Sequence, residues 1–280
     1  MLDILDRFLN PPRYLSRQQM RQWRKEGFLV LEGLISEDQA DAVNALIDTI
    51  AGGETRLAGD ATIDVLDGEL AGRRMRLADV DPAEMRHRVK INDLYLESDV
   101  VRQVNLHDDL VAALGDLLSG PPMICNSLNF IRGSAQDGHF DTWYMPPPTR
   151  GRMAVSSVCL EDVHPDAGPL FYYPGSHLFE PFRFPHGGIH AADADMTECF
   201  AYVRDLIEKN GLEKVVFTGR KGDVFLWHGQ LLHGGLPIAD RSRTRRSLVT
   251  HYWARDDVDA GRVASVGPGK FYLRREHQAA

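Results

Sequence analysis

The sequence is poor in cysteine and in long apolar runs. Its 280 residues hold three cysteines, Cys125, Cys159 and Cys199, which lie far apart and form no CxxC pair. An odd, scattered set of this kind is typical of a reducing compartment and argues against a disulfide framework. No run approaches the roughly 18 apolar residues of a membrane-spanning helix. The N-terminal MLDILDRFLN also lacks the apolar core of a signal peptide. We therefore expect a cytoplasmic protein with no membrane partner.

Basic residues are fewer than acidic ones, 32 Lys and Arg against 40 Asp and Glu. The formal net charge is -8, and the one basic cluster, RSRTRR at 241–246, is too short to reverse it. This balance argues against nucleic acid as a partner. There is no GxSxG motif, P-loop or dinucleotide-binding fingerprint, and no internal repeat. Hydrophobic content of 43% and charged content of 26% are ordinary for a globular protein. The oligomeric state cannot be read from the sequence.

The N-terminal third, about residues 1–120, is predicted to be mainly helical. A first amphipathic helix should end near Gly27 and be followed by a short strand over 28–31. A second helix opens with Ser36 and carries Gln39 three positions later, which is a capping box. A third helix is predicted over about 99–118, before Gly120-Pro121-Pro122.

Residues 55–95 show no clean hydrophobic period and are predicted to be irregular. Cations gather there, in GRRMRLADVDPAEMRHRVK. The segment either covers a pocket or is a solvated surface excursion, and the sequence does not separate these two interpretations. Its cations Arg73, Arg74, Arg76 and Lys90 either hold an anionic substrate or, as we expect for any one of them, belong to a solvated charge run.

After Pro122 short β-rich runs alternate with glycine and proline turns. The runs are MICNSLNFI, MAVSSVCL, LFYYP, KVVF, DVFLW and RSLVTHYW, with one helix over about 196–210 between them. Such spacing is typical of an antiparallel sandwich or small barrel. We expect one domain over 1–280, mainly β with flanking helices, in which a β core spans about 121–256.

The stretch DGHFDTWYMP places His139 and Asp141 two positions apart. In a strand, residues i and i+2 share a face, so an imidazole and a carboxylate would lie side by side. A third ligand has to come from elsewhere, and GDVFLWHGQLLHGG offers His228 and His233. Two histidines and one carboxylate on one face of a metal leave three positions open, as in non-haem Fe(II) oxygenases. HxD pairs, however, also occur in ordinary turns.

A basic strand start follows this histidine segment. In RTRRSLVTHYW, Arg245 and Ser247 share a strand face. A guanidinium fork beside a hydroxyl suits a carboxylate. An Fe(II) site needs a source of electrons for O2, and the dicarboxylate 2-oxoglutarate would need such a clamp for its far end.

These segments resemble the phytanoyl-CoA dioxygenase family of Fe(II)/2-oxoglutarate oxygenases. The likeness lies in HFDTWY at 139–144, in LEDVHPDAGPLFYYPGSH at 160–177, and in GDVFLWHGQLLHGG leading to RRSLVTHYW. The opening EGFLVLEGLISEDQADAV is also similar, so the likeness covers most of the chain. It implies a double-stranded β-helix, which is a cupin-like jelly-roll, and Fe(II), 2-oxoglutarate and O2 as cofactor and cosubstrates.

The resemblance also implies roles for individual residues. These are His139, Asp141 and His233 as iron ligands; Arg245 and Ser247 as 2-oxoglutarate contacts; and Ser157 and Asn129 as further cosubstrate contacts. The resemblance favours His233 over His228, because the HG turn at His233 matches the distal histidine of the family. The spacing from His233 leaves Arg243 and Arg246 as rivals of Arg245.

This sequence departs from the family pattern at two positions. Phe140 stands where glutamine is common, and HGG replaces HGS after the distal histidine. Neither change removes a ligand. Asp141 is intact, which favours hydroxylation over halogenation.

Other residues near these motifs keep two interpretations each. Trp143 and Tyr144 either wall the substrate site or pack in the core. His251 either faces the pocket or is a buried, hydrogen-bonded core histidine, and we expect the second. We expect His177 to brace a turn rather than to bind metal.

The expected function is hydroxylation of a C–H bond in a small-molecule metabolite, coupled to conversion of 2-oxoglutarate to succinate. Two alternatives stay open: a non-catalytic cupin-like binding protein, and a metal-dependent hydrolase or isomerase that uses the same three residues. The substrate itself is not readable, although HxDTWY favours a polar metabolite.

Overall fold

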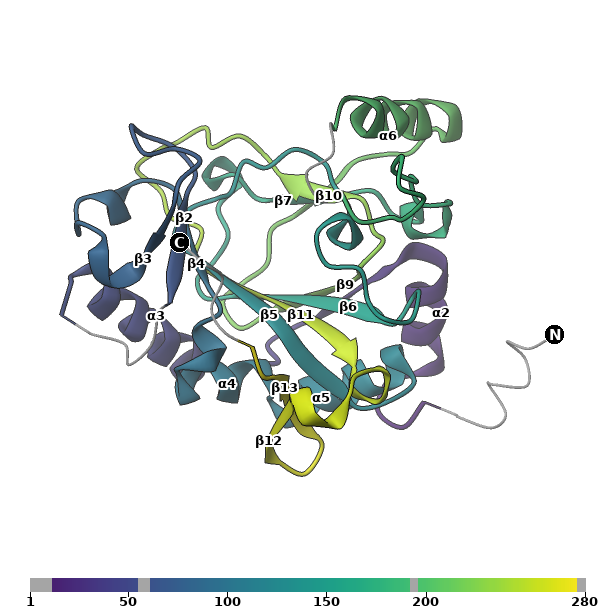
Figure 1. The fold of residues 1–280 in the computed structure, drawn as a ribbon, viewed down its shortest axis with the longest axis horizontal. Helices are drawn as coiled ribbons and strands as arrows, with labels where there is room; N and C mark the ends of the chain where they lie inside the picture. Colours follow the sequence, from purple (N-terminus) through teal and green to yellow (C-terminus); the bar gives the residue numbers. More distant parts are fainter. Residues whose placement is uncertain (1–11, 55–60, 192–195, 276–280) are drawn as a thin grey trace.

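Two antiparallel sheets face each other at the centre of the molecule (Figure 1). The computed structural model describes residues 12–54, 61–191 and 196–275; the stretch MLDILDRFLN lies outside them. The large sheet has ten strands. Eight of them run in the order β1 (Phe28–Leu31), β9 (Val224–His228), β6 (Met153–Cys159), β11 (Ser247–Ala254), β5 (Pro122–Phe130), β4 (Val89–Asn92), β2 (Thr62–Val65) and β3 (Arg74–Arg76). The other two extend from β5: β13 (Lys270–Leu273) pairs with β5, and β12 (Val263–Gly267) pairs with β13. The small sheet is β10 (His233–Gly235), β7 (Leu170–Tyr172) and β8 (Val215–Phe217).

The N-terminal helices begin where their capping residues predict. Ser16 and Ser36 each accept a bond from the backbone of a glutamine three positions on, which completes capping boxes for α2 (Arg17–Glu26) and α3 (Glu37–Ala51). Gly27 ends α2 in the left-handed region, and a side chain there would collide with the ring of His177. The single helix expected over 99–118 is in fact two, α4 (Asp99–Asn105) and α5 (Asp108–Leu118), because Leu106 leaves the helical conformation.

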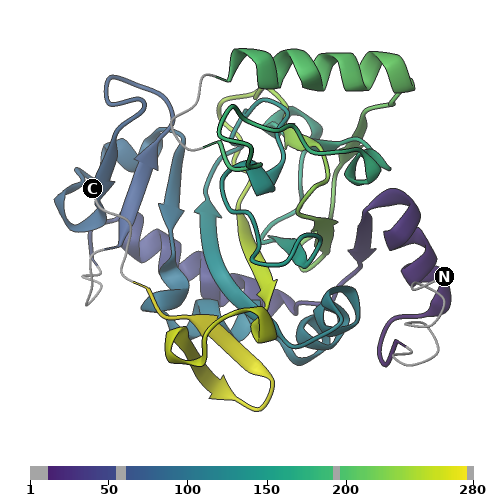
Figure 2. The ribbon, with the colours of Figure 1, turned by 45° about the vertical axis from the view of Figure 1, so that its right-hand side comes forward.

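Helices cover the outer face of each sheet. Under the large sheet, α3, α4 and α5 bury residues such as Ile47, Val101 and Leu114 against Ile91 and Leu248 (Figures 1 and 2). On the other side, α6 (Thr197–Asn210) lies over the small sheet. A third apolar cluster, which includes Val155, Tyr172 and Phe225, joins the inner faces of the two sheets. The functional side chains therefore lie between the sheets, at the end where this apolar filling stops.

Two expectations about the extent of β structure were wrong. The segment 61–92 is not irregular: β2, β3 and β4 extend the large sheet, and residues 55–60 lie outside the described part. The β structure also continues past residue 256 into β12 and β13. Strands of three or four residues that include charged side chains leave only a weak hydrophobic period, which explains why β2, β3 and β4 were not predicted. Within the described ranges, no helix combines the length and the apolar character needed to cross a bilayer.

A buried ion pair fastens the C-terminal segment to the large sheet. Asp93 is fully buried, adopts φ 55°, and accepts hydrogen bonds from Asn126 Nδ2 at 2.8 Å and Ser127 N at 3.0 Å. Its counterion is Arg275. A carboxylate removed from water in this way needs its charged partner, because desolvation of the lone charge is costly.

Replacing Arg275 by alanine should therefore destabilise the protein by about 3–5 kcal/mol, since Asp93 would be left buried without a counterion. Urea unfolding followed by circular dichroism measures this change. Arg274→Ala removes the same charge from an exposed neighbour and should cost less than about 0.5 kcal/mol. Equal midpoints for the two variants would contradict the account.

Candidate metal centre

His139 and His233 are joined by hydrogen bonds between their backbones. His139 N donates to His233 O at 2.9 Å, and His233 N donates to His139 O at 3.1 Å, which makes an isolated antiparallel bridge. The sequence predicts a strand that continues from His139 through Asp141. Instead, Asp141 begins a 3-10 turn over Asp141–Trp143. The turn swings the carboxylate back toward the two imidazoles. The HxD pair is thus brought together by a bridge and a turn rather than by a pleated strand.

The three side chains converge on one small volume. Nε2 of His139 lies 3.7 Å from Oδ1 of Asp141, and Nε2 of His233 lies 3.6 Å from the same oxygen. All three potential ligand atoms are within 4.8 Å of one another, and all three residues are buried. Two imidazole nitrogens and one carboxylate oxygen form the donor set that suits Fe(II) or another divalent first-row metal.

Hydrogen bonds behind these groups set their orientation. Nδ1 of His139 lies 2.8 Å from Asp137 O, and Nδ1 of His233 lies 2.9 Å from Leu231 O. A carbonyl oxygen can only accept, so each Nδ1 carries the proton and each Nε2 presents its lone pair to the centre. On the other side, Trp227 Nε1 donates to Asp141 Oδ2 at 2.7 Å. Such outer contacts fix ligand geometry in metal sites.

The protonation states also fit metal binding. Burial, reinforced by the neighbouring His233, lowers the pKa of His139 to about 4. Burial alone would raise the pKa of Asp141, but the imidazoles of His233 and His251 outweigh it, and the pKa falls well below its usual range. At neutral pH the centre therefore offers a neutral imidazole and an ionised carboxylate, the forms that bind metals.

The other histidines are separated by their positions. His228 packs between Trp23 and His177, with ring centroids 6.0 and 5.3 Å away, so the structure brings His233 and not His228 to the centre. His177 occupies the turn over Ser176–Leu178, as expected. His251 was expected to be a core histidine; it is buried, but its Nε2 lies 3.4 Å from Asp141 Oδ1, so it faces the centre.

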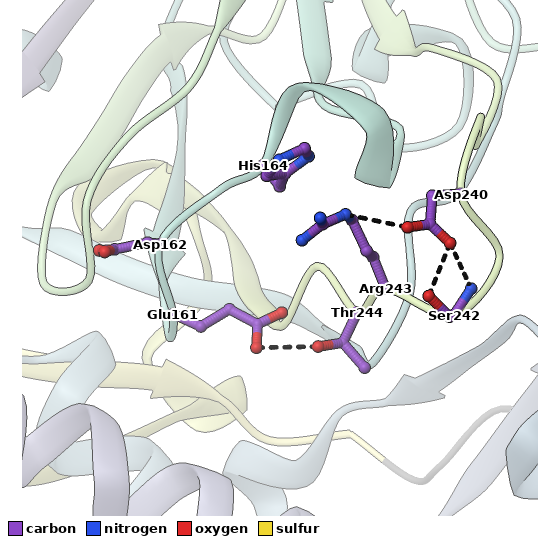
Figure 3. Close-up of a pocket in the computed structure, with 7 residues that line it drawn as sticks. All are labelled: Glu161, Asp162, His164, Asp240, Ser242, Arg243 and Thr244. Carbon is purple, nitrogen blue, oxygen red and sulfur yellow. Dashed lines mark hydrogen bonds and ion pairs between the residues drawn. The ribbon is translucent and has the colours of Figure 1, made fainter.

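Arg245 is the one arginine of its cluster that enters the space between the sheets. It is 7% exposed, and its Nε has no hydrogen-bond partner among the described residues. Its rivals are engaged outside: Arg243 pairs with Asp240 at 3.1 Å in a surface pocket (Figure 3), and Arg246 pairs with Asp48 at 2.6 Å. Burial lowers the pKa of Arg245 to about 10, which leaves it charged at neutral pH.

Glu161 holds the backbone that delivers Arg245. Its Oε2 accepts from Thr244 Oγ1 at 2.9 Å, also drawn in Figure 3, and its Oε1 accepts from Arg246 N at 2.7 Å. Arg245 N donates to Ile131 O, so the pairing of β11 with β5 continues one step beyond the strand. Because the residues on both sides of Arg245 are fastened, its side chain has a defined direction.

Ser247 and Ser157 share the inner face of the large sheet with Arg245, whereas Asn129 does not. Ser247 and Arg245 alternate along the chain with His251, and Ser157 lies opposite Val249 on the same side. The Ser247 hydroxyl is buried without a partner among the described residues. Asn129 was expected to join them, but it lies opposite Leu248 and Ile91, whose side chains belong to the helix-covered core. The pleat therefore turns Asn129 away from the centre, and that expectation was wrong.

The two aromatic residues after Asp141 separate into different roles. Trp143 is 0% exposed and packs edge-on against Phe140 and Phe200 in the core beneath α6. Tyr144 is 50% exposed, and its ring lies 5.7 Å from that of His139. Tyr144 therefore faces the centre, whereas Trp143 is a core residue.

A cavity of about 370 Å³ opens onto the centre, and we call it the active-site cavity. It is lined by Arg74, Lys90, Asn92, Asn126, Leu128, Gln136, His139, Asp141, Tyr144, Met145 and His251. Arg74 Nε lies 2.5 Å from Asp64 Oδ1, and Lys90 Nζ lies 2.8 Å from Asp64 Oδ2. Burial would raise the pKa of Asp64, but the Arg74 hydrogen bond and the Lys90 charge lower it to about 2. With Asp64 and the lining Asp141 both counted, the two cations leave the cavity wall formally neutral.

The likeness to a known family spans most of the chain. Residues 23–247 match the family described as phytanoyl-CoA dioxygenase (PhyH). The chain belongs to the phytanoyl-CoA dioxygenase family. This confirms the family and the enzyme class expected from the sequence, a 2-oxoglutarate-dependent non-haem iron dioxygenase.

Individual relatives are distant in sequence. The ectoine dioxygenase of Halomonas elongata is 25% identical over 256 residues, covering 87% of this chain and 71% of its own. The peroxisomal phytanoyl-CoA dioxygenase of Mus musculus is 22% identical over 260 residues, covering 86% and 69%.

Solved structures confirm the cupin jelly-roll fold. EctD from S. alaskensis, crystallised with 2-oxoglutarate and 5-hydroxyectoine, matches with a TM-score of 0.64 and 20% identity, covering 97% of this chain and 88% of its own. The carbocyclase SnoK from nogalamycin biosynthesis matches with a TM-score of 0.61 and 19% identity, covering 86% and 84%. SnoK is named a carbocyclase and not a hydroxylase, so this fold does not prescribe one oxidation.

Sequence reasoning did not identify three residues that support or line the site. Trp227 donates to Asp141, Glu161 holds the backbone around Arg245, and Gln136 lines the active-site cavity. Trp227 shares a strand face with Phe225, which is an ordinary core pattern. Glu161 acts on a segment 83–85 positions away, and nothing local indicates that contact. His251 is different, because its parity with Arg245 and Ser247 along one strand was a usable signal.

Trp227→Phe should weaken divalent-metal binding by roughly 10- to 100-fold, because it removes the donor that orients Asp141 while keeping an aromatic ring in place. Anaerobic titration with Fe(II), or with Co(II) as a spectroscopic probe, measures the affinity. Trp253→Phe is the matched control, since Trp253 Nε1 has no partner among the described residues. Unchanged affinity in Trp227→Phe would show that the Asp141 contact is dispensable.

His228 should make the fold sensitive to acid. Burial, then the charge of His177, lowers its pKa to about 4 from an ordinary value of 6.5. Below pH 6.5 His228 binds a proton in the unfolded chain, whereas in the folded chain it does so only near pH 4. The free energy of unfolding therefore falls as the pH falls through that window.

The loss should approach about 1.4 kcal/mol per pH unit for this one group. Urea unfolding of His228→Gln between pH 6.5 and 4.5 should show a correspondingly shallower slope than wild type. His164→Gln, on an exposed turn, should retain the wild-type slope. Parallel slopes in all three proteins would rule out the assignment.

Proposed function

We propose that this chain hydroxylates a C–H bond of a small polar metabolite, with Fe(II) bound by His139, Asp141 and His233. The observation that carries the proposal is the combination of that triad with the buried Arg245 on the inner face of the large sheet, whose Nε has no partner among the described residues. A dicarboxylate whose near end reaches the metal would place its far carboxylate at such a guanidinium. When bound, Fe(II) and 2-oxoglutarate activate O2 and supply the oxidising power, with succinate and CO2 as products.

The residues around the triad support this assignment. Arg245 and Ser247 present donors that lack protein partners within the described chain and would bind the far carboxylate, with Ser157 beside them. The formal charges of a divalent metal, Asp141, Arg245 and a dicarboxylate cancel. Such a complete set is expected where charges are buried, because unpaired charges are costly in a low dielectric.

The active-site cavity supports a polar substrate. Leu128, Met145 and Tyr144 provide apolar contact, whereas Asn92, Asn126 and Gln136 offer amide groups. Arg74 and Lys90 would contact an acceptor-rich or anionic part of the substrate, with Asp64 holding both cations in place. A volume of about 370 Å³ suits a small metabolite rather than an entire acyl-CoA thioester.

The proposal is tested by Fe(II)-dependent formation of succinate from 2-oxoglutarate. The purified protein should form succinate with Fe(II) and lose this activity when the metal is chelated. Asp141→Ala should reduce it at least about 100-fold, because one of three ligands is lost. Absence of Fe(II)-dependent succinate in the wild-type protein, with turnover supported by Zn(II) instead, would favour a hydrolase or isomerase.

The role of Arg245 is tested separately. Arg245→Gln should raise the half-saturating concentration of 2-oxoglutarate about 10- to 100-fold, because a charged hydrogen bond to a carboxylate contributes about 1.5–3 kcal/mol. Arg243→Gln makes the same charge change on the surface and should stay within about twofold of wild type. The reverse ranking of the two variants would move the carboxylate site to Arg243.

A further inference from the structure

A second cavity, of about 290 Å³, lies next to the active-site cavity and is strongly basic. Arg86, Arg88, Arg132 and Arg241 line it, together with His87 and Asp67. We call it the basic pocket. Four arginines against one aspartate give a formal charge of +3 with the histidine neutral, in a chain whose net charge is -8. Like charges concentrated against the overall balance repel one another unless an anion joins them.

Two of the arginines are engaged in holding the walls of the pocket. Arg88 Nε lies 2.9 Å from Asp67 Oδ2, and its Nη1 donates to Ser134 O at 2.7 Å. Arg132 donates from Nε to Arg86 O at 3.2 Å and from Nη1 to Arg241 O at 2.7 Å. Arg132 therefore ties together the two chain segments that carry Arg86 and Arg241.

The other two guanidinium groups are exposed. The side chains of Arg86 and Arg241 have no ion pair or hydrogen-bond acceptor among the described residues. The backbone of each is fixed by the same Arg132 side chain, so both groups are held at one pocket. A guanidinium presents paired N–H donors that match the oxygens of a phosphate, and two of them suit a dianion better than a monocarboxylate.

The basic pocket adjoins the active-site cavity along β4. Arg88, Lys90 and Asn92 alternate and therefore share a face, with Arg88 on the basic pocket and the other two on the active-site cavity. Leu66 N donates to Arg88 O, which continues the strand pairing to this residue. At about 3.3 Å per residue, Arg88 and Lys90 are roughly 7 Å apart along the strand. A second connection is made by Ala135 and Gln136, neighbours in the chain that line one cavity each.

We propose that the basic pocket binds a phosphate group, with Arg86 and Arg241 as its direct ligands and with Arg88 and Arg132 as positioning residues. The group is either carried by the substrate, at the end remote from the oxidised carbon, or supplied as a free anion. Only its assignment to the substrate rests on the proposed oxygenase function; anion binding at the pocket does not.

Isothermal titration of the full-length protein with pyrophosphate tests the site without any turnover. Wild type should bind one equivalent saturably at 0.15 M salt. The double variant Arg86→Gln/Arg241→Gln should bind at least about tenfold more weakly, because both direct ligands are removed. Arg204→Gln, an exposed arginine of α6, should stay within about twofold. No saturable binding by wild type, or equal affinity in the double variant, would overturn the proposal.

Succinate formation then separates the two sources. Matched phosphorylated and dephosphorylated metabolites are compared for stimulation of 2-oxoglutarate turnover. Stimulation by a phosphorylated compound alone, with KM raised at least about tenfold in the double variant and substrate-free turnover unchanged, assigns the phosphate to the substrate. Equal stimulation by both members of a pair, with pyrophosphate still bound, assigns it to a free anion. Failure of the oxygenase function would appear as absent succinate while pyrophosphate binding persists.

Discussion

One buried carboxylate organises the centre of this protein. Asp141 is buried, and the groups around it offset the desolvation of its carboxylate. The indole of Trp227 donates to one oxygen, and imidazole nitrogens converge on the other. A buried charge is tolerated only when it is paired and hydrogen-bonded. The bridge between His139 and His233 and the turn after Phe140 hold these side chains in position. A divalent metal held by His139, Asp141 and His233 would supply the positive charge that neutral imidazoles do not.

The division between fold and site follows the two faces of the large sheet. Its outer face is apolar and covered by α3, α4 and α5, so it provides stability. Its inner face becomes steadily more polar along β11, from Val249 to Ser247 and Arg245. Because the outer face is rigidly packed, the inner side chains keep their directions even though several of them lack a protein partner in the described chain. Unsatisfied buried polar atoms in a well-packed sheet indicate a bound group.

The sequence predicts this centre better than it predicts the sheet edge. His139, Asp141, His233, Arg245 and Ser247 carry family motifs, and the capping boxes locate two helices. Strands β2 to β4 were missed because strands of three or four residues that include charged side chains show little periodicity. Asn129 was misplaced because a shift of one residue along a strand reverses its face, which only the register reveals. The contact from Trp227 and the support by Glu161 are long-range, and no local pattern encodes them.

Positive charge is arranged by depth in an acidic protein. Arg245 is fully enclosed, Arg74 and Lys90 line the active-site cavity, and Arg86 and Arg241 lie in the exposed basic pocket. At an ionic strength near 0.1 M, charges more than about 10 Å apart are largely screened, so the net charge of -8 acts weakly at a distance. A small anion inside a cavity would therefore respond mainly to the cations that line it. The proposed cosubstrate and the proposed phosphate group are both small anions, and the cations lie at the depths where these groups would bind.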